Sequence, residues 1–392
     1  MNTNANPGAQ GACEPRFDAV RRVFEEQVAS GREVGAAVAV TLDGDPIVDL
    51  WGGFADQART TPWDRDTMVN VYSTTKGVTA ICAHRLVDEG RLELDAPVAR
   101  YWPEFAQAGK AEIPVRWLLS HRSGLPAVRE PLPGEALYSW GAMTAALAAQ
   151  EPWWTPGTRH GYQAVTFGWL VGEVIRRVSG KSVGRYFHDE IGKPLGVDFH
   201  IGTDDDEHGR IAEMSQLSAE PSPDGASLME VILSDPKGVT AMAFLNPSSL
   251  ALGVNHAEWR RAEIPGANGH GTARALARLY GVLARGGSQD GVHLLSDDAI
   301  ARCHAEQSQG EDLVLRVPTR FGQGFMLSQR GVKGATMGPS ARTFGHPGAG
   351  GSLAFADPER RIGFAYVMNR MGPHILMDPR ATALVDAVYA SL

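Results

Sequence analysis

Two side chains in the first quarter of the chain have the types and the spacing of a nucleophile and its base. Ser73 and Lys76 lie three residues apart in NVYSTTKGVT, residues 70–79. That spacing places two side chains on one face of a helix. A serine hydroxyl needs a base within hydrogen-bonding reach, and a lysine can serve when burial lowers its pKa. A helix N-cap followed by a solvated lysine would give the same pattern.

A third reactive side chain, Tyr162, lies in TPGTRHGYQAVTFG, directly before a helical pattern. A phenol near a lysine ammonium can ionise and accept the serine proton. The alternative is packing, because most tyrosines are amphipathic packing residues. Trp153 and Trp154 precede this loop, and we expect Trp154 to contact or support the substrate.

A glycine-rich stretch, FGHPGAGGSLAF at residues 344–355, completes the set. Glycines allow a strand edge to approach a ligand closely. We expect the backbone N–H of Ala349 to pair with that of Ser73 as an oxyanion hole. His346 is expected to orient the tyrosine or the substrate, and Gly348 to support the same site. A plain glycine-rich turn with a histidine at its mouth is the alternative.

The flanking segments predict the elements that must position these residues. Residues 17–31 have helical periodicity, and two apolar runs around DGDP in residues 35–53 predict a β-hairpin. Residues 73–89 predict a helix that ends before Gly90. Further helices are predicted at 115–121, 139–150, 165–180, 271–287 and 378–392, and further strands within 321–327 and 343–369.

Strand patterns therefore lie at both ends of the chain, with helical patterns between them. This order favours an α/β (α+β) fold, in which an antiparallel sheet built from both chain ends is flanked by helices and carries an inserted, mostly helical lobe. We expect residues 1–93 and 263–392 to form the α/β lobe and residues 94–262 the helical lobe, with the active site between them. Residues 1–16 are expected to be flexible, and residues 218–227 to form an exposed loop.

Composition and motifs exclude several other classes of protein. The 392 residues carry a net charge of −8 without a basic run, which argues against a nucleic-acid partner. No apolar run approaches the length of a membrane span. The chain contains no Walker or Rossmann glycine motif and no histidine spacing typical of metal sites, so we expect no cofactor and no metal. SH at 120–121 and NGHG at 268–271 are interpreted as turn or supporting residues.

The cysteines and the first residues indicate the compartment. Cys13, Cys82 and Cys303 are far apart, with neither zinc spacing nor a disulfide framework, which suits a reducing environment. The first residues contain no apolar segment typical of an export signal. We therefore expect a cytoplasmic protein that does not bind membranes; its oligomeric state is left open.

Several motifs occurring in one order resemble a known superfamily. They are STTK (73–76), LLSHRSGLP (118–126), GYQ around Tyr162, NGHGTARALARLYGVLARGG (268–287), HPG (346–348) and GGSLAFADPERRIGFAYVMN (350–369). Together they resemble the serine β-lactamase and penicillin-binding-protein superfamily, in which S-x-x-K carries the nucleophile. The likeness is greatest to the class C β-lactamase-like branch and, within it, to the family VIII carboxylesterases. It extends over nearly the whole chain from about residue 17.

The resemblance implies roles for these residues and also shows two departures. Ser73 would be the acylated nucleophile, Lys76 would accept its proton or hold the network, and Tyr162 would act as general base and then acid. His346 stands where β-lactamases usually have the lysine of K-T-G, and Ala164 stands where they have the asparagine of Y-x-N. Both departures favour plain esters over β-lactams, although weak β-lactam turnover remains compatible with the family.

The resulting hypothesis is a serine esterase that hydrolyses small carboxylic esters through an acyl-enzyme. The alternatives are a β-lactamase or D-amino-acid peptidase, an acyltransferase that uses the same intermediate, and a non-catalytic binding protein on this fold. The chain contains no G-x-S-x-G, which argues against the common α/β-hydrolase esterases. Seven of the nine tryptophans lie between Trp102 and Trp259. These rings either line an apolar pocket or fill the helical core.

Overall fold

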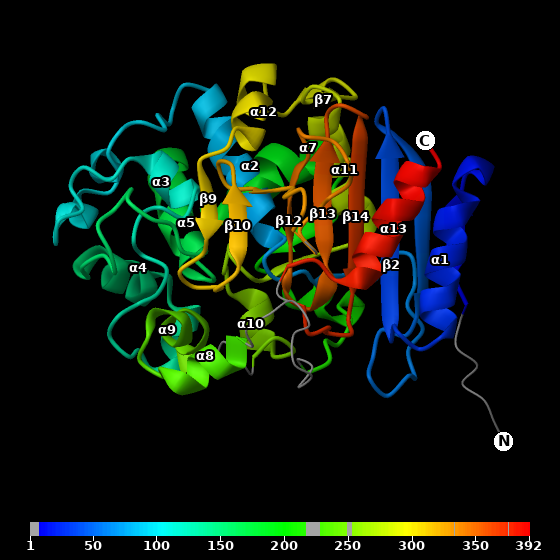
Figure 1. The fold of residues 1–392 in the computed structure, drawn as a ribbon, viewed down its shortest axis with the longest axis horizontal. Coiled ribbons are helices and arrows are strands. Elements are labelled where there is room, and N and C mark those ends of the chain that lie inside the picture. Colours follow the sequence, from blue (N-terminus) through cyan, green and yellow to red (C-terminus); the bar gives the residue numbers. More distant parts are fainter. Residues whose placement is uncertain (1–7, 217–227, 249–252, 333, 375) are drawn as a thin grey trace.

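Strands from both ends of the chain form one antiparallel sheet, as the order of sequence patterns predicts (Figure 1). The computed structural model describes residues 8–216, 228–248, 253–332, 334–374 and 376–392. Within these residues, nine strands pair in the order β1-β3-β2-β14-β13-β12-β11-β10-β9. The other strands form a three-stranded sheet, β4-β6-β5, and the hairpin β7-β8.

The strands of the large sheet are β1 (Gln10–Cys13), β2 (Gly35–Leu42), β3 (Asp45–Gly53), β9 (Ser308–Glu311), β10 (Pro318–Phe321), β11 (Met326–Leu327), β12 (Phe344–Pro347), β13 (Leu353–Asp357) and β14 (Ile362–Met368). The small strands are β4 (Val69–Asn70), β5 (Phe199–Ile201), β6 (Gly269–Gly271), β7 (Ser288–Gln289) and β8 (Val292–His293). The predicted hairpin is β2–β3, and both residues of its turn, Asp43 and Gly44, have positive φ. Such a turn matches the twist of the strands that it joins.

The helices are α1 (Asp18–Ala29), α2 (Thr75–Asp88), α3 (Val115–Leu119), α4 (Trp140–Ala149), α5 (Thr166–Ser179), α6 (Val183–Phe187), α7 (Lys193–Leu195), α8 (Leu228–Ser234), α9 (Val239–Leu245), α10 (Ala257–Arg261), α11 (Ala273–Ala284), α12 (Asp297–His304) and α13 (Pro379–Ala390). Those from α3 to α10 fall in the segment predicted to be mostly helical. The boundaries of the two lobes at residues 94 and 263 stay a prediction.

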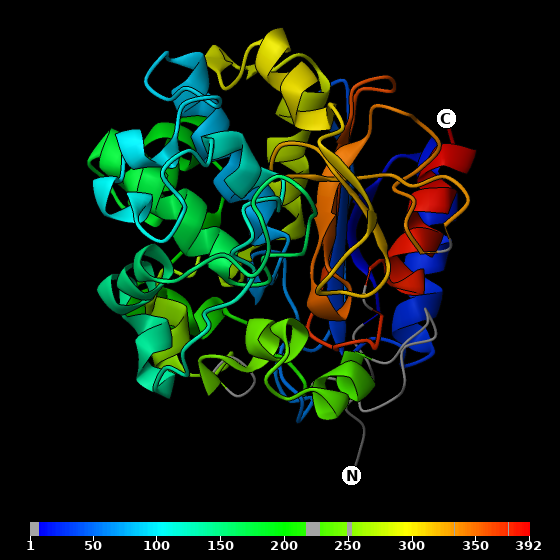
Figure 2. The same ribbon diagram turned by 60° about the vertical axis from the view of Figure 1, so that its left-hand side comes forward.

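Helices cover both faces of the sheet (Figure 2). α1 and α13 pack together on one face, and α11 packs on β2, β13 and β14 on the other. Every residue of β14 is buried, because both of its faces are covered. α11 approaches closely at Gly363, where a Cβ atom would lie 2.3 Å from the backbone nitrogen of Gly281. The sheet is therefore a rigid layer against which α2 and β12 are placed.

The expected flexible segment is wrong in part. Residues 10–13 form β1, which pairs with β3 from Gln10 to Cys13. This strand pairs at the sheet edge through its backbone groups. QGAC therefore has no apolar pattern from which a strand could be predicted. Residues 1–7 and the loop predicted at 218–227 lie outside the described residues. Across the described ranges, no helix is long and apolar enough to cross a membrane.

Candidate active site

Ser73 lies in a tight turn directly before α2, and the helix itself begins two residues later than predicted, at Thr75. Tyr72 has φ of 44°, a left-handed conformation that non-glycine residues seldom adopt. The Lys76 N–H closes the turn by donating to the Ser73 carbonyl at 2.9 Å. The backbone hydrogen bonds of the described residues include none from the Ser73 N–H, and the residue is half-buried.

Lys76 is fully buried, and its amine contacts three oxygens. Nζ lies 2.9 Å from Ser73 Oγ, 2.7 Å from the Ala164 carbonyl oxygen and 2.8 Å from that of Gly266. Burial lowers the pKa of Lys76 well below its usual value. A neutral amine that donates to the two carbonyls directs its lone pair at the serine hydroxyl. An ammonium would instead donate to all three oxygens and leave the serine proton without an acceptor.

Tyr162 lies against the same amine, with its ring centroid 4.7 Å from Lys76 Nζ. Burial raises the pKa of Tyr162 above its ordinary value, and a hydrogen bond with the Ser73 side chain partly opposes that rise. The phenol is therefore protonated at neutral pH. It can donate to Ser73 Oγ while the serine hydroxyl donates to Lys76 Nζ.

The main chain around Tyr162 is held at three successive N–H groups. The Gly161 N–H donates to the His121 carbonyl at 3.1 Å, and the Gln163 N–H donates to Nδ1 of the same histidine at 3.2 Å. Between them, the Tyr162 N–H donates to Oδ1 of Asp312 at 3.0 Å. The backbone of the tyrosine is thus fixed from two separate parts of the chain.

Two buried histidines flank the Tyr162 ring, and both are neutral. The ring centroids of His121 and His346 lie 5.1 Å and 5.9 Å from that of Tyr162. Burial lowers the pKa of His121 well below its usual range and that of His346 to about 3. His346 Nδ1 lies 2.6 Å from the Pro347 carbonyl, so the proton resides on Nδ1. Its Nε2 is buried without a partner among the described residues.

The end of β12 packs against the turn that carries Ser73. The Thr74 hydroxyl donates to the His346 carbonyl at 3.1 Å, and the Ser352 hydroxyl donates to the Val71 carbonyl at 2.8 Å. A Cβ atom at Gly348 would lie 2.2 Å from that Val71 oxygen. Glycine is required here because a side chain would push β12 away from the nucleophile.

Ala349 follows this contact and is exposed. The Gly348 carbonyl accepts the Gly351 N–H at 3.1 Å, which fixes the peptide plane that contains the Ala349 N–H. That N–H makes none of the backbone hydrogen bonds of the described residues. The N–H groups of Ser73 and Ala349 are therefore both free to receive an oxyanion.

Trp154 is half-buried beside the tyrosine loop. Its indole N–H donates to the Arg159 carbonyl at 3.3 Å, and a Cβ atom at Gly161 would lie 2.5 Å from its ring. The structure thus places Trp154 against the residue before Tyr162. By contrast, Trp169 and Trp259 are fully buried and belong to the hydrophobic core, which was the alternative interpretation of the tryptophans.

A buried apolar cluster extends from Tyr162 along the loop between β9 and β10. The buried residues of this cluster include Tyr162, Ala127, Ala164, Ala243, Val314, Leu315 and Val317. Trp153, Met242 and Phe244 are partly exposed and pack against it. These partly exposed side chains offer apolar area that an apolar group of an ester could cover.

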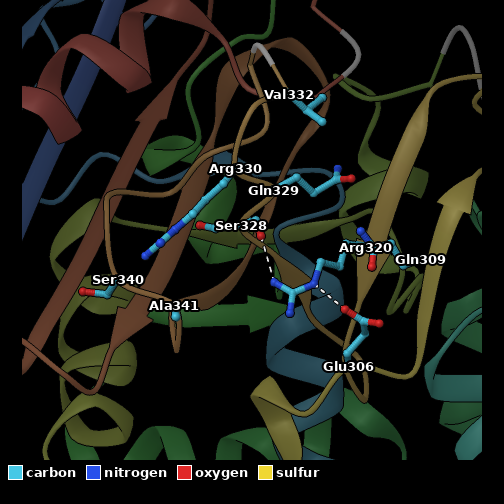
Figure 3. Close-up of a pocket in the computed structure, with 9 residues that line it drawn as sticks. All are labelled: Glu306, Gln309, Arg320, Ser328, Gln329, Arg330, Val332, Ser340 and Ala341. Carbon is cyan, nitrogen blue, oxygen red and sulfur yellow. Dashed lines mark hydrogen bonds and ion pairs between the residues drawn. The ribbon is translucent and has the colours of Figure 1, made fainter.

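A cavity of about 440 Å³ lies elsewhere, along β10 and the segment that follows β11 (Figure 3). Its lining consists of Glu306, Gln309, Arg320, Ser328, Gln329, Arg330, Val332, Ser340 and Ala341. Arg320 crosses it and donates to Glu306 at 2.7 Å and to the Ser328 carbonyl at 2.9 Å. None of the residues around Ser73 lines this cavity.

Sequence reasoning missed two contributions to the site. Asp312 begins the run DLVLRV, and an acid placed directly before apolar residues was the available signal of a buried carboxylate. The carbonyls of Ala164 and Gly266 act through the backbone, which leaves no mark in the side-chain pattern. Within the described parts of the chain, no group of histidine, cysteine, aspartate and glutamate side chains could hold a metal ion.

Fold and site together define a serine hydrolase, in which the Ser73 hydroxyl, the buried amine of Lys76 and the phenol of Tyr162 meet. The chain belongs to the Beta-lactamase family, whose profile matches residues 20–389.

Three relatives resemble the chain over most of its length. A penicillin-binding protein homologue from Caulobacter crescentus is 44% identical, with a TM-score of 0.90 over 98% of this chain and 100% of that one. The crystal structure of a family VIII carboxylesterase has 41% identity and a TM-score of 0.85, again over 98% and 100% of the two chains. The esterase/beta-lactamase LipL of Mycobacterium tuberculosis is 38% identical over 376 residues, which are 95% of this chain and 85% of LipL.

Proposed function

We propose that this chain is a serine carboxylesterase that hydrolyses small carboxylic esters through a covalent acyl-enzyme on Ser73. The observation that carries the proposal is the 2.9 Å contact between Ser73 Oγ and the buried amine of Lys76. The chain's similarity to an esterase/beta-lactamase and to a family VIII carboxylesterase supports it.

In the acylation step, Ser73 Oγ attacks the ester carbonyl carbon while its proton passes to Lys76 Nζ. The carbonyl oxygen becomes an oxyanion and accepts hydrogen bonds from the N–H groups of Ser73 and Ala349. The bond to the alcohol oxygen then breaks. Tyr162 gives its proton to the leaving alkoxide, and the Lys76 ammonium returns a proton to the tyrosine.

In the deacylation step, water attacks the acyl carbon of the Ser73 ester. Tyr162 takes the water proton as its own proton moves to Lys76, and the reverse transfer restores the serine hydroxyl. The unpartnered Nε2 of His346 is an acceptor that can hold the other proton of this water.

The environment of His346 favours esters over β-lactams. Its pKa of about 3 keeps the imidazole neutral, so it offers no charge to a substrate carboxylate. Ala164 supplies a carbonyl to Lys76 and carries no side-chain amide. Both groups that β-lactamases of this kind use to hold their substrate are therefore replaced.

A β-lactamase or D-amino-acid peptidase is the second candidate, and the name of LipL favours the first of these. An acyltransferase would use the same acyl-enzyme with an alcohol in place of water. The three activities differ in the acyl donor or acceptor and share Ser73, so substrate comparison separates them.

The test of the nucleophile is Ser73→Ala with p-nitrophenyl butyrate as substrate. We expect a loss of kcat of about 10⁶-fold, as is typical when a nucleophile is removed, with an unchanged melting temperature. Ser30→Ala, at a residue whose hydroxyl contacts only the Gln27 carbonyl among the described residues, is the matched control and should retain full activity. A folded Ser73→Ala protein that still turns over the ester would contradict the mechanism.

The test of the substrate class compares kcat/KM for p-nitrophenyl acetate, butyrate and octanoate with that for nitrocefin. We expect the esters to exceed nitrocefin by at least about 100-fold, because the site lacks a cation for the β-lactam carboxylate. Dominant nitrocefin turnover would identify a β-lactamase instead. Transfer products formed in added alcohols would identify an acyltransferase.

We also propose that the protein acts in the cytoplasm on a small-molecule ester, without a nucleic-acid or membrane partner. Its three cysteines are unpaired, and Cys82 and Cys303 are buried thiols, which is compatible with a reducing compartment. Fractionation of cells that express the full-length protein would test the location.

A further inference from the structure

One buried carboxylate joins the tyrosine to the loop that flanks it. Asp312, directly after β9, is fully buried. Its Oδ1 accepts N–H groups from Tyr162 at 3.0 Å, Val314 at 2.8 Å and Leu315 at 2.9 Å. Its Oδ2 accepts the Thr319 hydroxyl at 3.2 Å. A carboxylate is the acceptor-only group that can satisfy so many donors in a buried place.

These contacts connect two parts of the molecule that are distant in sequence. Tyr162 lies in the helical region, whereas Asp312 follows β9, an edge strand of the large sheet (Figure 1). Two further hydrogen bonds reinforce the junction: the Leu313 N–H donates to the His160 carbonyl at 3.3 Å, and His160 Nε2 lies 2.9 Å from the Thr319 hydroxyl. The position of Tyr162 relative to the sheet therefore depends on this junction.

We propose that Asp312 is a positioning residue for the esterase reaction: it holds the Tyr162 main chain, and with it the phenol, where the leaving alcohol must be protonated. The inference rests on the proposed function of the site. Asp312 touches no reacting atom, and it acts through the tyrosine and through the loop of Val314 and Leu315.

The charge of Asp312 also helps Tyr162 to act as a proton donor. The other titratable groups that face Tyr162 are Lys76, His121 and His346, and burial lowers the pKa of all three. The Asp312 carboxylate adds to the effect of burial, which raises the pKa of Tyr162. The phenol therefore keeps its proton until the leaving group needs it.

The test exploits leaving groups of different basicity. p-Nitrophenolate leaves without protonation, whereas an alkoxide must receive a proton as the bond breaks. In Asp312→Asn we expect kcat/KM for ethyl butyrate, which reports the steps up to acylation, to fall about 100-fold, the size of effect that a small misplacement of a catalytic group produces. For p-nitrophenyl butyrate we expect kcat/KM to fall by about tenfold or less, because its leaving group needs no proton from Tyr162.

The controls separate this inference from the proposed function and from misfolding. Thr319→Val removes the hydroxyl that contacts Asp312 Oδ2 and His160 Nε2 but leaves the Tyr162 N–H bond to Oδ1. Its loss on ethyl butyrate should therefore be well below that of Asp312→Asn. Asp312→Glu keeps the charge but displaces the acceptor, so it should show the same leaving-group-dependent loss. This second variant tests the inference if Asp312→Asn does not fold. Equal losses on both esters in folded variants, or no loss, would overturn the role of Asp312. A wild-type protein inactive on both esters would instead refute the esterase itself.

Discussion

At the scale of single residues, the chemistry depends on Lys76 being uncharged. The two carbonyls that accept from its amine come from Ala164 and Gly266, so the lone pair is left for Ser73. Burial alone accounts for its lowered pKa. Burial thus makes the amine available as a base, and the two backbone carbonyls aim its lone pair at Ser73.

This predicts the pH dependence of kcat/KM. As the pH falls through the pKa of Lys76, the amine takes up a proton and loses its lone pair, so activity is lost on the acid side. Neither His121 nor His346 can cause this loss near the ordinary histidine pKa of about 6.5, because burial lowers both of their pKa values. A profile from about pH 5 to about pH 9 should therefore keep its acid limb in His346→Gln. A limb that disappears in that variant would assign the titration to the histidine.

At the scale of elements, β12 must approach the turn before α2 closely enough for its glycine turn to face Ser73. Gly348 makes this approach possible, since a Cβ atom there would lie 2.2 Å from both the Val71 carbonyl oxygen and Ser352 Oγ. The Thr74 hydroxyl holds the two segments together through the His346 carbonyl. The proposed oxyanion hole thus depends on the packing of a strand end against a helix start.

Gly348→Ala should separate these two elements. Relief of the clash must move β12, so we expect a loss of stability of about 1–3 kcal/mol and a fall in kcat of about 10²-fold as one oxyanion donor is displaced. Steady-state kinetics and urea denaturation measure the two effects. Ala349→Ser retains the backbone N–H at an exposed position and should leave both quantities unchanged. A fully active Gly348→Ala enzyme would show that Ala349 does not supply the second donor.

Elements that depend on local pattern were predictable from the sequence. The hairpin β2–β3, the helix α5 with its stop at Gly180, and the Ser73–Lys76 pair all follow from periodicity, turn residues and spacing. The helix start was misplaced by two residues because the turn at Ser73 has helix-like spacing. β1 was missed because its pairing relies on backbone groups.

Contacts between distant segments could not be predicted in the same way. Asp312 lies 150 residues from Tyr162 in sequence, and nothing in either local pattern refers to the other. The Gly266 carbonyl likewise reaches Lys76 across 190 residues. Such contacts depend on how the edge of the sheet packs against the helices. Local patterns in a single sequence do not predict that packing.

At the scale of the whole molecule, a buried ionic cluster joins both chain ends behind the site. Arg380 of α13 donates to Glu33 at 2.9 Å, to Asp378 at 2.8 Å and to the Gly350 carbonyl at 2.8 Å. The Tyr366 hydroxyl of β14 donates to the same Glu33 carboxylate. The cluster therefore ties the segment after α1, the sheet and the glycine turn into one unit.

Burial raises the pKa of Glu33 to about 7, so its carboxylate is charged above that pH. There Glu33→Gln should destabilise the fold by about 3 kcal/mol, because it leaves the buried guanidinium of Arg380 with less compensating charge. Urea denaturation with an unchanged m-value measures this loss. Asp43→Asn is the control: it removes an ion pair to Arg361 of similar length, 2.7 Å, but with both side chains more than half exposed. Water screens such a pair, so the control should change stability by less than about 0.5 kcal/mol. Equal effects of the two substitutions would mean that burial adds nothing to the Arg380 cluster, and that hydrophobic packing alone holds the two chain ends together.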